Sequence, residues 1–431
     1  MPAGRWARYA DLRRTRLHAR SVPRTHGLGG RQTVVGGRWS TVSVVGGRWS
    51  VDSDEIARYS SNCKAAHMNS LDHITLPHYL IGSSALDRYF RRTPGRNQYA
   101  LVVGDLVELA RGASAVTYPG LDDWDAAIHT GSGSLYLRCV DSIETVPWHP
   151  LPVMNFLYNA HERSFVDRFG VYRKLRDSAL APSDLPERAE VTDSTILDAA
   201  VLAARHGYHV PRSLHAERSW RLQLTAEHAR MLWIDIVTGA APWLGLQLLM
   251  ESGFIEHYWP KLAQMNATPH AKEYHPEGNV WQHSLETLRY RKAYGALLSS
   301  ALLLHDCGKP FAERTAQRAF DSHAEIGAAI ARDFLAGLGF PREFTEDVWF
   351  LIRHHMLPGL VSQLPVFRTQ HVMRSRLFPL LLELYRCDLS STYRGPDGYY
   401  RACRTYRAFL KNTENPFRTP EGRKLVQLYV E

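Results

Sequence analysis

The chain has 431 residues, 45% of them hydrophobic, and a formal net charge of +9, so it is long enough to bury two or three separate cores. No apolar run approaches the ~20 residues needed to cross a bilayer, which argues against a membrane protein. The five cysteines form no Cys-x-x-Cys pair. We therefore expect neither a disulfide framework nor a thiolate zinc site, and we expect a reducing, cytoplasmic compartment.

The basic charge is concentrated at the start of the chain. Residues 1–67 contain twelve Lys and Arg against four acidic residues, which leaves the remainder nearly neutral. They repeat Val-Val-Gly-Gly-Arg-Trp-Ser at 34–40 and 44–50, and they lack helical or strand periodicity, so we expect disorder. Three interpretations remain: an organellar transit peptide, an RNA-binding arm, or an upstream region read in frame. We favour the last, with Met68 as the start, because the patterned sequence begins directly after it.

Residues 68–148 carry short apolar runs separated by turn residues, which predicts a small mixed-sheet head. We expect a strand at 78–81 that meets a helix at the Gly82 turn, and a second strand at 99–103. Asp105 is a suitable N-cap for the helix that follows. A strand, a glycine turn and a helix often approach phosphates, although the same order also fits an ordinary α/β unit.

Residues 149–272 are expected to form a helical neck. Apolar side chains recur there at helical spacing, as at Ile196, Ala199 and Ala203, and Gly253 marks a break between helices. Such positions are most simply core, and nothing in this segment demands catalysis.

Side chains that can bind a metal lie at the ends or on the apolar faces of the helices expected further on. They are His283, the His305-Asp306 pair, His323, His354 with His355 beside it, and Asp388. A single histidine at such a position is usually a core or surface residue. A buried carboxylate such as Asp388 on a leucine-rich face is costly, however, unless it meets a cation. Mixed His and Asp ligands suit a divalent transition ion.

Local signals place these residues at helix termini. Gly308 and Pro310 end the apolar helix 296–304 directly after the His-Asp pair. Ser322 and Glu325 form a capping-box pattern, which predicts that His323 lies in the first turn of the next helix.

The order His, His-Asp, His, His, Asp, with Gly-Lys after the pair, resembles the HD superfamily of metal-dependent phosphohydrolases. The runs 278–283, 302–310 and 352–355 are similar to the HD domain appended to bacterial tRNA nucleotidyltransferases. The resemblance implies an all-helical HD domain at 273–431, with C-terminal helices included. It implies that a primary ion is bound by His283, His305, Asp306 and Asp388. It also implies that His323 and His354 could add a second ion bridged by Asp306, with His355 as the alternative to His354.

Asp306 and Lys309 are the candidate catalytic residues. Asp306 would orient a metal-bound water, and Lys309 could stabilise charge developing on the phosphoryl oxygens. A lysine that complements the dipole of a helix C-terminus explains Lys309 equally well.

The segment before the HD domain resembles the head and neck of bacterial tRNA nucleotidyltransferases and poly(A) polymerases. The run 80–87 matches their strand-turn-helix and 98–103 their Asp-x-Asp strand. Where those enzymes hold Mg²⁺ on two aspartates, this chain has Gln98 and Ala100, and their phosphate-facing Arg corresponds to Leu86. An amide and a methyl group cannot replace two carboxylates, so the resemblance implies a degenerate head without nucleotide addition.

We therefore predict an α+β protein, helix-dominated overall, that acts as a metal-dependent phosphohydrolase with one or two divalent ions (Mn, Fe, Ni, Co, Zn or Mg). The expected substrate is a nucleotide or an RNA-end phosphomonoester or cyclic phosphodiester, with a nucleotide or an RNA 3′ end as partner. One alternative is an active tRNA nucleotidyltransferase or poly(A) polymerase. The other is a non-catalytic RNA- or nucleotide-binding protein. The Tyr- and Arg-rich stretch 393–418 fits a solvated amphipathic helix or a surface that stacks on bases.

Overall fold

The structure is a computed structural model that describes residues 74–412, apart from 114, 122, 131–132, 178–179, 181–190, 270–277, 314–319 and 321. The extension 1–67, with its repeat and the proposed start at Met68, lies outside the described residues. So does the end of the Tyr- and Arg-rich stretch. Within the described part, none of the helices combines the length and the apolar character that a membrane crossing requires.

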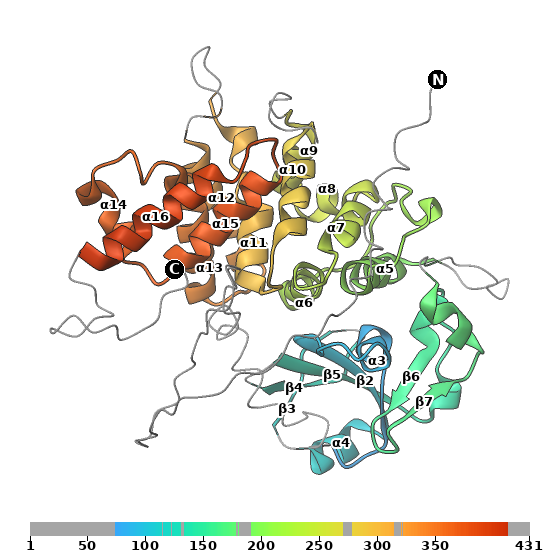
Figure 1. Cartoon of the computed structure of the whole chain (residues 1–431). Helices are drawn as coiled ribbons and strands as arrows, with labels where there is room; N and C mark the ends of the chain where they lie inside the picture. Colours follow the sequence, from blue (N-terminus) through green and yellow to red (C-terminus); the bar gives the residue numbers. More distant parts are fainter. Residues whose placement is uncertain are drawn as a thin grey trace, which may run out of the picture. The chain divides into compact units, whose positions relative to one another are not determined.

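A seven-stranded sheet forms the head (Figure 1). Its strand order is β3-β4-β5-β2-β1-β6-β7, with β2 and β5 parallel and the other neighbours antiparallel, which confirms the predicted mixed sheet. The strands are β1 (His78–Leu80), β2 (Asn97–Val103), β3 (Val116–Thr117), β4 (Ala126–Thr130), β5 (Gly133–Val140), β6 (Phe156–Asn159) and β7 (Ser164–Asp167).

The sheet continues beyond the predicted boundary at residue 148. Strands β6 and β7 fall in the segment that we expected to be helical, where β6 pairs with β1 and β7 pairs with β6. Each has only four residues, too few for a clear alternation of apolar and polar side chains, and the β1–β6 pairing joins segments distant in sequence. The helical neck therefore begins later than the sequence indicates.

Two helices of the head follow strands, as predicted. Helix α3 (Gly82–Tyr89) begins at the Gly82 turn, where the backbone φ of +55° suits glycine. Helix α4 (Leu106–Gly112) is capped by Asp105, whose carboxylate accepts a hydrogen bond from the Glu108 amide at 2.8 Å. The Glu108 side chain accepts in return from the Asp105 amide at 3.1 Å, which completes a capping box.

The residues of β2 that face the cavity are shifted by one position from those we expected. From the sequence we placed Gln98 and Ala100 at the positions of the metal-binding aspartates. Ala100 and Val102 are buried on the face that packs with Leu109 of α4. Tyr99 and Leu101 line a cavity on the other face, together with residues of the neck helices. Side chains of a strand alternate between faces, so a slip of one residue in a strand covered on both sides exchanges them. The side chains of β2 that face this cavity are thus a phenol and an isobutyl group, again without a carboxylate.

Helices make up the rest of the described chain, coloured green to red in Figure 1. This confirms a helix-dominated α+β protein. The helices are α5 (Asp193–His206), α6 (Ala226–Val237), α7 (Pro242–Glu251), α8 (Phe254–Tyr258), α9 (Pro260–Ala267), α10 (Val280–Thr287), α11 (Ala296–Leu304), α12 (His323–Gly337), α13 (Arg342–Arg353), α14 (Val366–Met373), α15 (Phe378–Ser390) and α16 (Asp397–Asn412).

Helix α11 forms the centre of the second half of the chain, and all nine of its residues are buried. Its two serines do not leave polar groups without partners. Ser300 Oγ accepts a hydrogen bond from the Trp233 indole at 2.9 Å, and Ser299 accepts one from Arg291 at 2.5 Å. Because the helix is apolar on every side, its C-terminal end places the following residues in the interior.

Helix α16 carries the Tyr- and Arg-rich stretch and is amphipathic. Ala402, Tyr406, Phe409 and Leu410 are buried in the main core, while most of its arginines lie on the opposite, more exposed side. For the part of the stretch that the structure describes, this arrangement agrees with the interpretation as a solvated amphipathic helix.

Candidate metal centre

The candidate ligands come from the ends or inner faces of five helices. His283 lies on α10, the His305-Asp306 pair follows the last residue of α11, and His323 is the first residue of α12. His355 follows the end of α13, and Asp388 lies on α15. Residues separated by more than a hundred positions in sequence therefore meet in one region.

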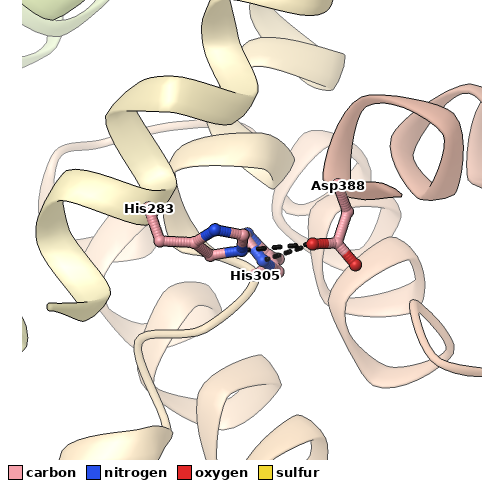
Figure 2. A group of neighbouring side chains, drawn as sticks. All are labelled: His283, His305 and Asp388. Atoms are coloured by element: carbon pink, nitrogen blue, oxygen red, sulfur yellow. Dashed lines mark hydrogen bonds and ion pairs between the residues drawn. The ribbon is translucent and has the colours of Figure 1, made fainter. Parts of the chain in front are cut away.

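His283, His305 and Asp388 form the first group, whose ligand atoms all lie within 4.8 Å of one another (Figure 2). The His283 Nε2 lies 3.1 Å from Asp388 Oδ1, and the His305 Nε2 lies 3.9 Å from the same oxygen. Both imidazoles are almost fully buried, while the Asp388 side chain is 21% exposed. The open side of this group is therefore at the carboxylate.

Asp306, His323 and His355 form the second group. The Nε2 atoms of the two histidines lie 3.3 Å apart. Asp306 Oδ1 lies 3.6 Å from the His323 Nε2 and 3.9 Å from the His355 Nε2. His323 is the more exposed imidazole of this group, so solvent reaches it from the side of α12.

The carboxylate of Asp306 lies between the two groups. Its Oδ2 is 3.2 Å from the His305 Nε2 and 3.7 Å from the His283 Nε2, whereas its Oδ1 points to the second group. Lys309 Nζ also contacts Oδ2, at 2.6 Å. Asp306 thus contacts both groups and the nearby ammonium.

Backbone carbonyls fix the tautomer of three imidazoles. The Nδ1 atoms of His305, His323 and His355 lie 2.8, 2.9 and 2.7 Å from the carbonyl oxygens of Leu302, Phe320 and Ile352. A carbonyl oxygen can only accept, so each Nδ1 carries a hydrogen, and in the neutral ring the lone pair is then on Nε2. The buried His305 Nε2 has no hydrogen-bond partner within the described part of the chain. Nε2 atoms aimed at one another and at carboxylates fit a divalent cation.

Burial keeps the histidines of the second group neutral. It lowers the pKa of His355 to about 3, and it also lowers the pKa of His323. Burial would raise the pKa of Asp388, but the hydrogen bond from His283 and the charge of His305 outweigh it and hold that pKa below its usual range. Neutral imidazoles and an ionised carboxylate are the protonation states in which these groups bind metal.

His354, which we predicted as a ligand with His355 as the alternative, does not join either group. Its ring contacts Phe350, at 4.8 Å between centroids, and faces His371 at 6.3 Å. Helix α13 ends at Arg353, and the two histidines that follow point in different directions. The structure thus brings the alternative, His355, to the position beside His323.

The predicted capping box at the start of α12 is also absent. Ser322 adopts φ +58° in the left-handed region, and its side chain makes no capping hydrogen bond. Glu325 instead forms an ion pair with Arg353 of α13 at 2.5 Å. The interaction between helices competes with the local one, and the short sequence pattern contains no information about α13.

The described residues of the head form no comparable group of ligands. Asp87 forms an ion pair with Arg205 of α5 at 2.6 Å, and Asp105 caps α4. Asp235 of α6 accepts hydrogen bonds from Asn97, at 3.0 Å, and from the Tyr99 hydroxyl. These carboxylates are therefore engaged in contacts within the head or with the neck, and among the described residues only the two groups above cluster in a way that suits a metal ion.

Comparisons with known proteins show two kinds of sequence similarity. Residues 280–383 match the family model of the HD domain. A CC-adding tRNA nucleotidyltransferase of Thermus thermophilus is 33% identical over 158 residues, which cover 34% of this chain and 35% of that protein. A multifunctional CCA protein of Neisseria gonorrhoeae is 27% identical over 224 residues, 49% of this chain and 53% of that protein. The chain thus spans about half or less of the curated relatives it matches.

Solved structures of low similarity cover a larger share of the chain. A CCA-adding enzyme solved with ATP superposes with a TM-score of 0.40 at 13% identity, over 84% of each chain. The Bacillus stearothermophilus CCA-adding enzyme in complex with CTP gives a TM-score of 0.42 at 12% identity, over 79% of this chain and 80% of that one.

Proposed function

We propose that this chain, which carries an HD domain and is similar in sequence to tRNA nucleotidyltransferases, is a metal-dependent phosphohydrolase. The observation that supports this most directly is the arrangement of Asp306 between two groups of buried side chains with metal-binding atoms. We further propose that its substrates are nucleotides, or RNA ends that carry a phosphomonoester or cyclic phosphodiester.

The residues suggest how the reaction proceeds. His283, His305, Asp306 and Asp388 would hold one divalent ion, and His323 and His355 together with Asp306 could hold a second. A bound ion would lower the pKa of a coordinated water and polarise a phosphoryl oxygen.

The side chains around the ion would position that water and the phosphate. Asp306 is buried at a fixed place between the groups, so its carboxylate would orient the attacking water. Lys309, whose ammonium contacts Asp306, would stabilise the negative charge that develops on the phosphoryl oxygens.

We also propose that the head does not add nucleotides. The side chains of β2 that face the cavity are Tyr99 and Leu101, which offer no anionic oxygen to Mg²⁺. The nearby Asp235 is hydrogen-bonded to the Tyr99 hydroxyl and to Asn97. A magnesium-bound triphosphate would thus find no pair of carboxylates on β2 itself, and the carboxylates that do line the cavity, Asp123, Asp198 and Asp235, lie outside that strand.

The function is tested by measuring metal content and hydrolysis together. Purified full-length protein should contain a divalent ion and should hydrolyse nucleoside monophosphates or 2′,3′-cyclic nucleotides. In Asp306→Ala we expect bound metal to fall and kcat/KM to fall by about 10³ or more, because both groups lose their shared carboxylate.

Asp333→Ala is the matched control, because it removes a carboxylate from the exposed side of α12. It should retain metal and activity. A wild-type protein that holds no divalent ion, or an Asp306→Ala variant as active as the wild type, would refute the proposal.

A further inference from the structure

A cavity of about 450 Å³ opens beside the second group of candidate ligands. It is formed by the start of α12, the end of α13 and the short 3-10 helix Leu357–Gly359. His323 belongs both to the second group of candidate ligands and to the wall of the cavity. Its Nε2 faces Asp306 and His355, and its side chain lines the cavity. Anything that binds in the cavity is therefore adjacent to the metal-binding atoms.

The walls of the cavity are largely apolar and accessible. Phe320, Leu357, Met356 and Leu360 line it, and the last two are 52% and 45% exposed. Met356 and Leu360 thus leave apolar surface open to a ligand that enters the cavity. A ring, a thioether and branched aliphatic groups form a surface that suits a flat aromatic ligand.

The cavity has a defined orientation relative to the catalytic groups. The ammonium of Lys309 lies 5.6 Å from the centre of the Phe320 ring and also contacts Asp306. The Phe320 ring thus stands at the junction between Lys309 and the cavity. A phosphoryl group held near Asp306, Lys309 and His323 would direct the remainder of its molecule along Phe320 into the apolar cavity.

The rim of the cavity carries one ion pair, between Arg353 and Glu325. Both side chains are partly exposed, so they can exchange this contact for a ligand. A guanidinium offers hydrogen-bond donors and a flat face for stacking, and a carboxylate accepts from amino and hydroxyl groups. Such a pair can bind the polar edges of a sugar and a base, whereas a plain hydrocarbon ligand would offer it no hydrogen bonds.

We propose that this cavity binds the nucleoside part of the substrate, and that Met356 and Leu360 determine the preference for nucleotides over small aliphatic phosphates. The proposal rests on the hydrolase function above. The volume of the cavity lies within the range of about 300–1,000 Å³ that is usual for small-molecule sites. A site of this kind selects the substrate through the group next to the phosphate, while the metal-binding residues act on the phosphate itself.

The test compares two substrates in the full-length protein. The double variant Met356→Ala/Leu360→Ala should lose about tenfold more kcat/KM toward a nucleoside 5′-monophosphate than toward glycerol phosphate, mainly through KM. Phe367→Ala is the control, because it removes a 69% exposed aromatic side chain that does not line the cavity. This control should leave kcat/KM unchanged for both substrates. Equal losses on both substrates, or no loss on the nucleotide, would overturn the proposal.

Direct binding separates this inference from the hydrolase function. Calorimetric titration with the nucleoside 5′-monophosphate should give a Kd about tenfold weaker in the double variant than in the wild type. If the wild type binds the nucleotide in this way but hydrolyses nothing, the hydrolase function fails and the site stands. If the wild type hydrolyses phosphates while the double variant binds the nucleotide as tightly as the wild type, the site fails and the hydrolase function stands.

Discussion

Two adjacent histidines give the sharpest prediction about single residues. His355→Ala should lower the divalent metal content of the purified protein, since its Nε2 lies beside the Nε2 of His323 and the Oδ1 of Asp306. His354→Ala should leave the metal content unchanged, because that ring packs against Phe350 instead. Elemental analysis by mass spectrometry after gel filtration measures the difference. Equal metal loss in both variants, or a loss confined to His354→Ala, would contradict the arrangement.

The residue types of the site could be predicted from the sequence, but one choice between neighbours could not. His283, His305 and Asp388 were proposed from their order along the chain, and the structure brings them together. The choice between His354 and His355 depends on how the chain turns after α13, and successive residues near a helix end point about 100° apart. That turn is set by packing between helices, which a local pattern does not record.

At the scale of elements, the turn between α11 and α12 depends on Gly308. A Cβ atom at this position would lie 2.1 Å from the His323 carbonyl oxygen and 2.5 Å from the Gly327 nitrogen. Because these are backbone atoms, they can move only if the helix moves. We expect Gly308→Ala to lower the free energy of unfolding by about 1–3 kcal/mol and to displace His323, as overpacking does.

Gly337→Ala is the comparison for this turn. Gly337 is the last residue of α12, and a Cβ atom there would contact nothing within 4 Å. Alanine favours the helix, so this variant should gain up to about 1 kcal/mol in stability. Urea unfolding monitored by circular dichroism measures both. The explanation fails if Gly308→Ala unfolds at the same midpoint as the wild type.

The contact between β2 and α6 should make stability depend on pH. Burial raises the pKa of Asp235 to about 7, despite the donors Tyr99 and Asn97. The folded state thus binds a proton more tightly than the unfolded state does, so the stabilisation is complete below about pH 4 and is lost as the pH rises to about 7. Full loss corresponds to roughly 4 kcal/mol, as an order of magnitude.

Replacing this carboxyl group by an amide tests whether stability falls as the pH rises. Asp235→Asn should flatten the fall of Tm between pH 4 and pH 7, while Asp333→Asn, on an exposed part of α12, should leave the wild-type slope. Thermal unfolding at several pH values measures it. Parallel curves for the wild type and Asp235→Asn would show that Asp235 is ionised throughout this range.

The element boundaries show where local sequence information ends. The Asp105 cap and the helix end after α11 are local signals, and both were predicted. Strands β6 and β7 were not, because both are short, and β6 depends on pairing with the distant β1 while β7 pairs with β6. The register of β2 could not be fixed either, since both of its faces are covered and an apolar run does not tell them apart.

For the whole molecule, we expect no nucleotide addition to tRNA. With CTP, ATP and Mg²⁺, a tRNA that lacks its terminal CCA should remain unextended, because Tyr99 and Leu101 occupy the cavity face of β2. An active tRNA nucleotidyltransferase on the same RNA is the positive control for a gel assay. Incorporation of CMP or AMP above background would show that other carboxylates bind the metal, and would favour the nucleotidyltransferase alternative.

The position of Asp306 has a consequence for metal titrations. Its two oxygens face different groups, so two ions bound there would share one negative charge. Filling either position would then change the affinity of the other by the same factor, as thermodynamic reciprocity requires. Stepwise addition of metal to the apoprotein should therefore give a binding isotherm that departs from the shape expected of two independent sites.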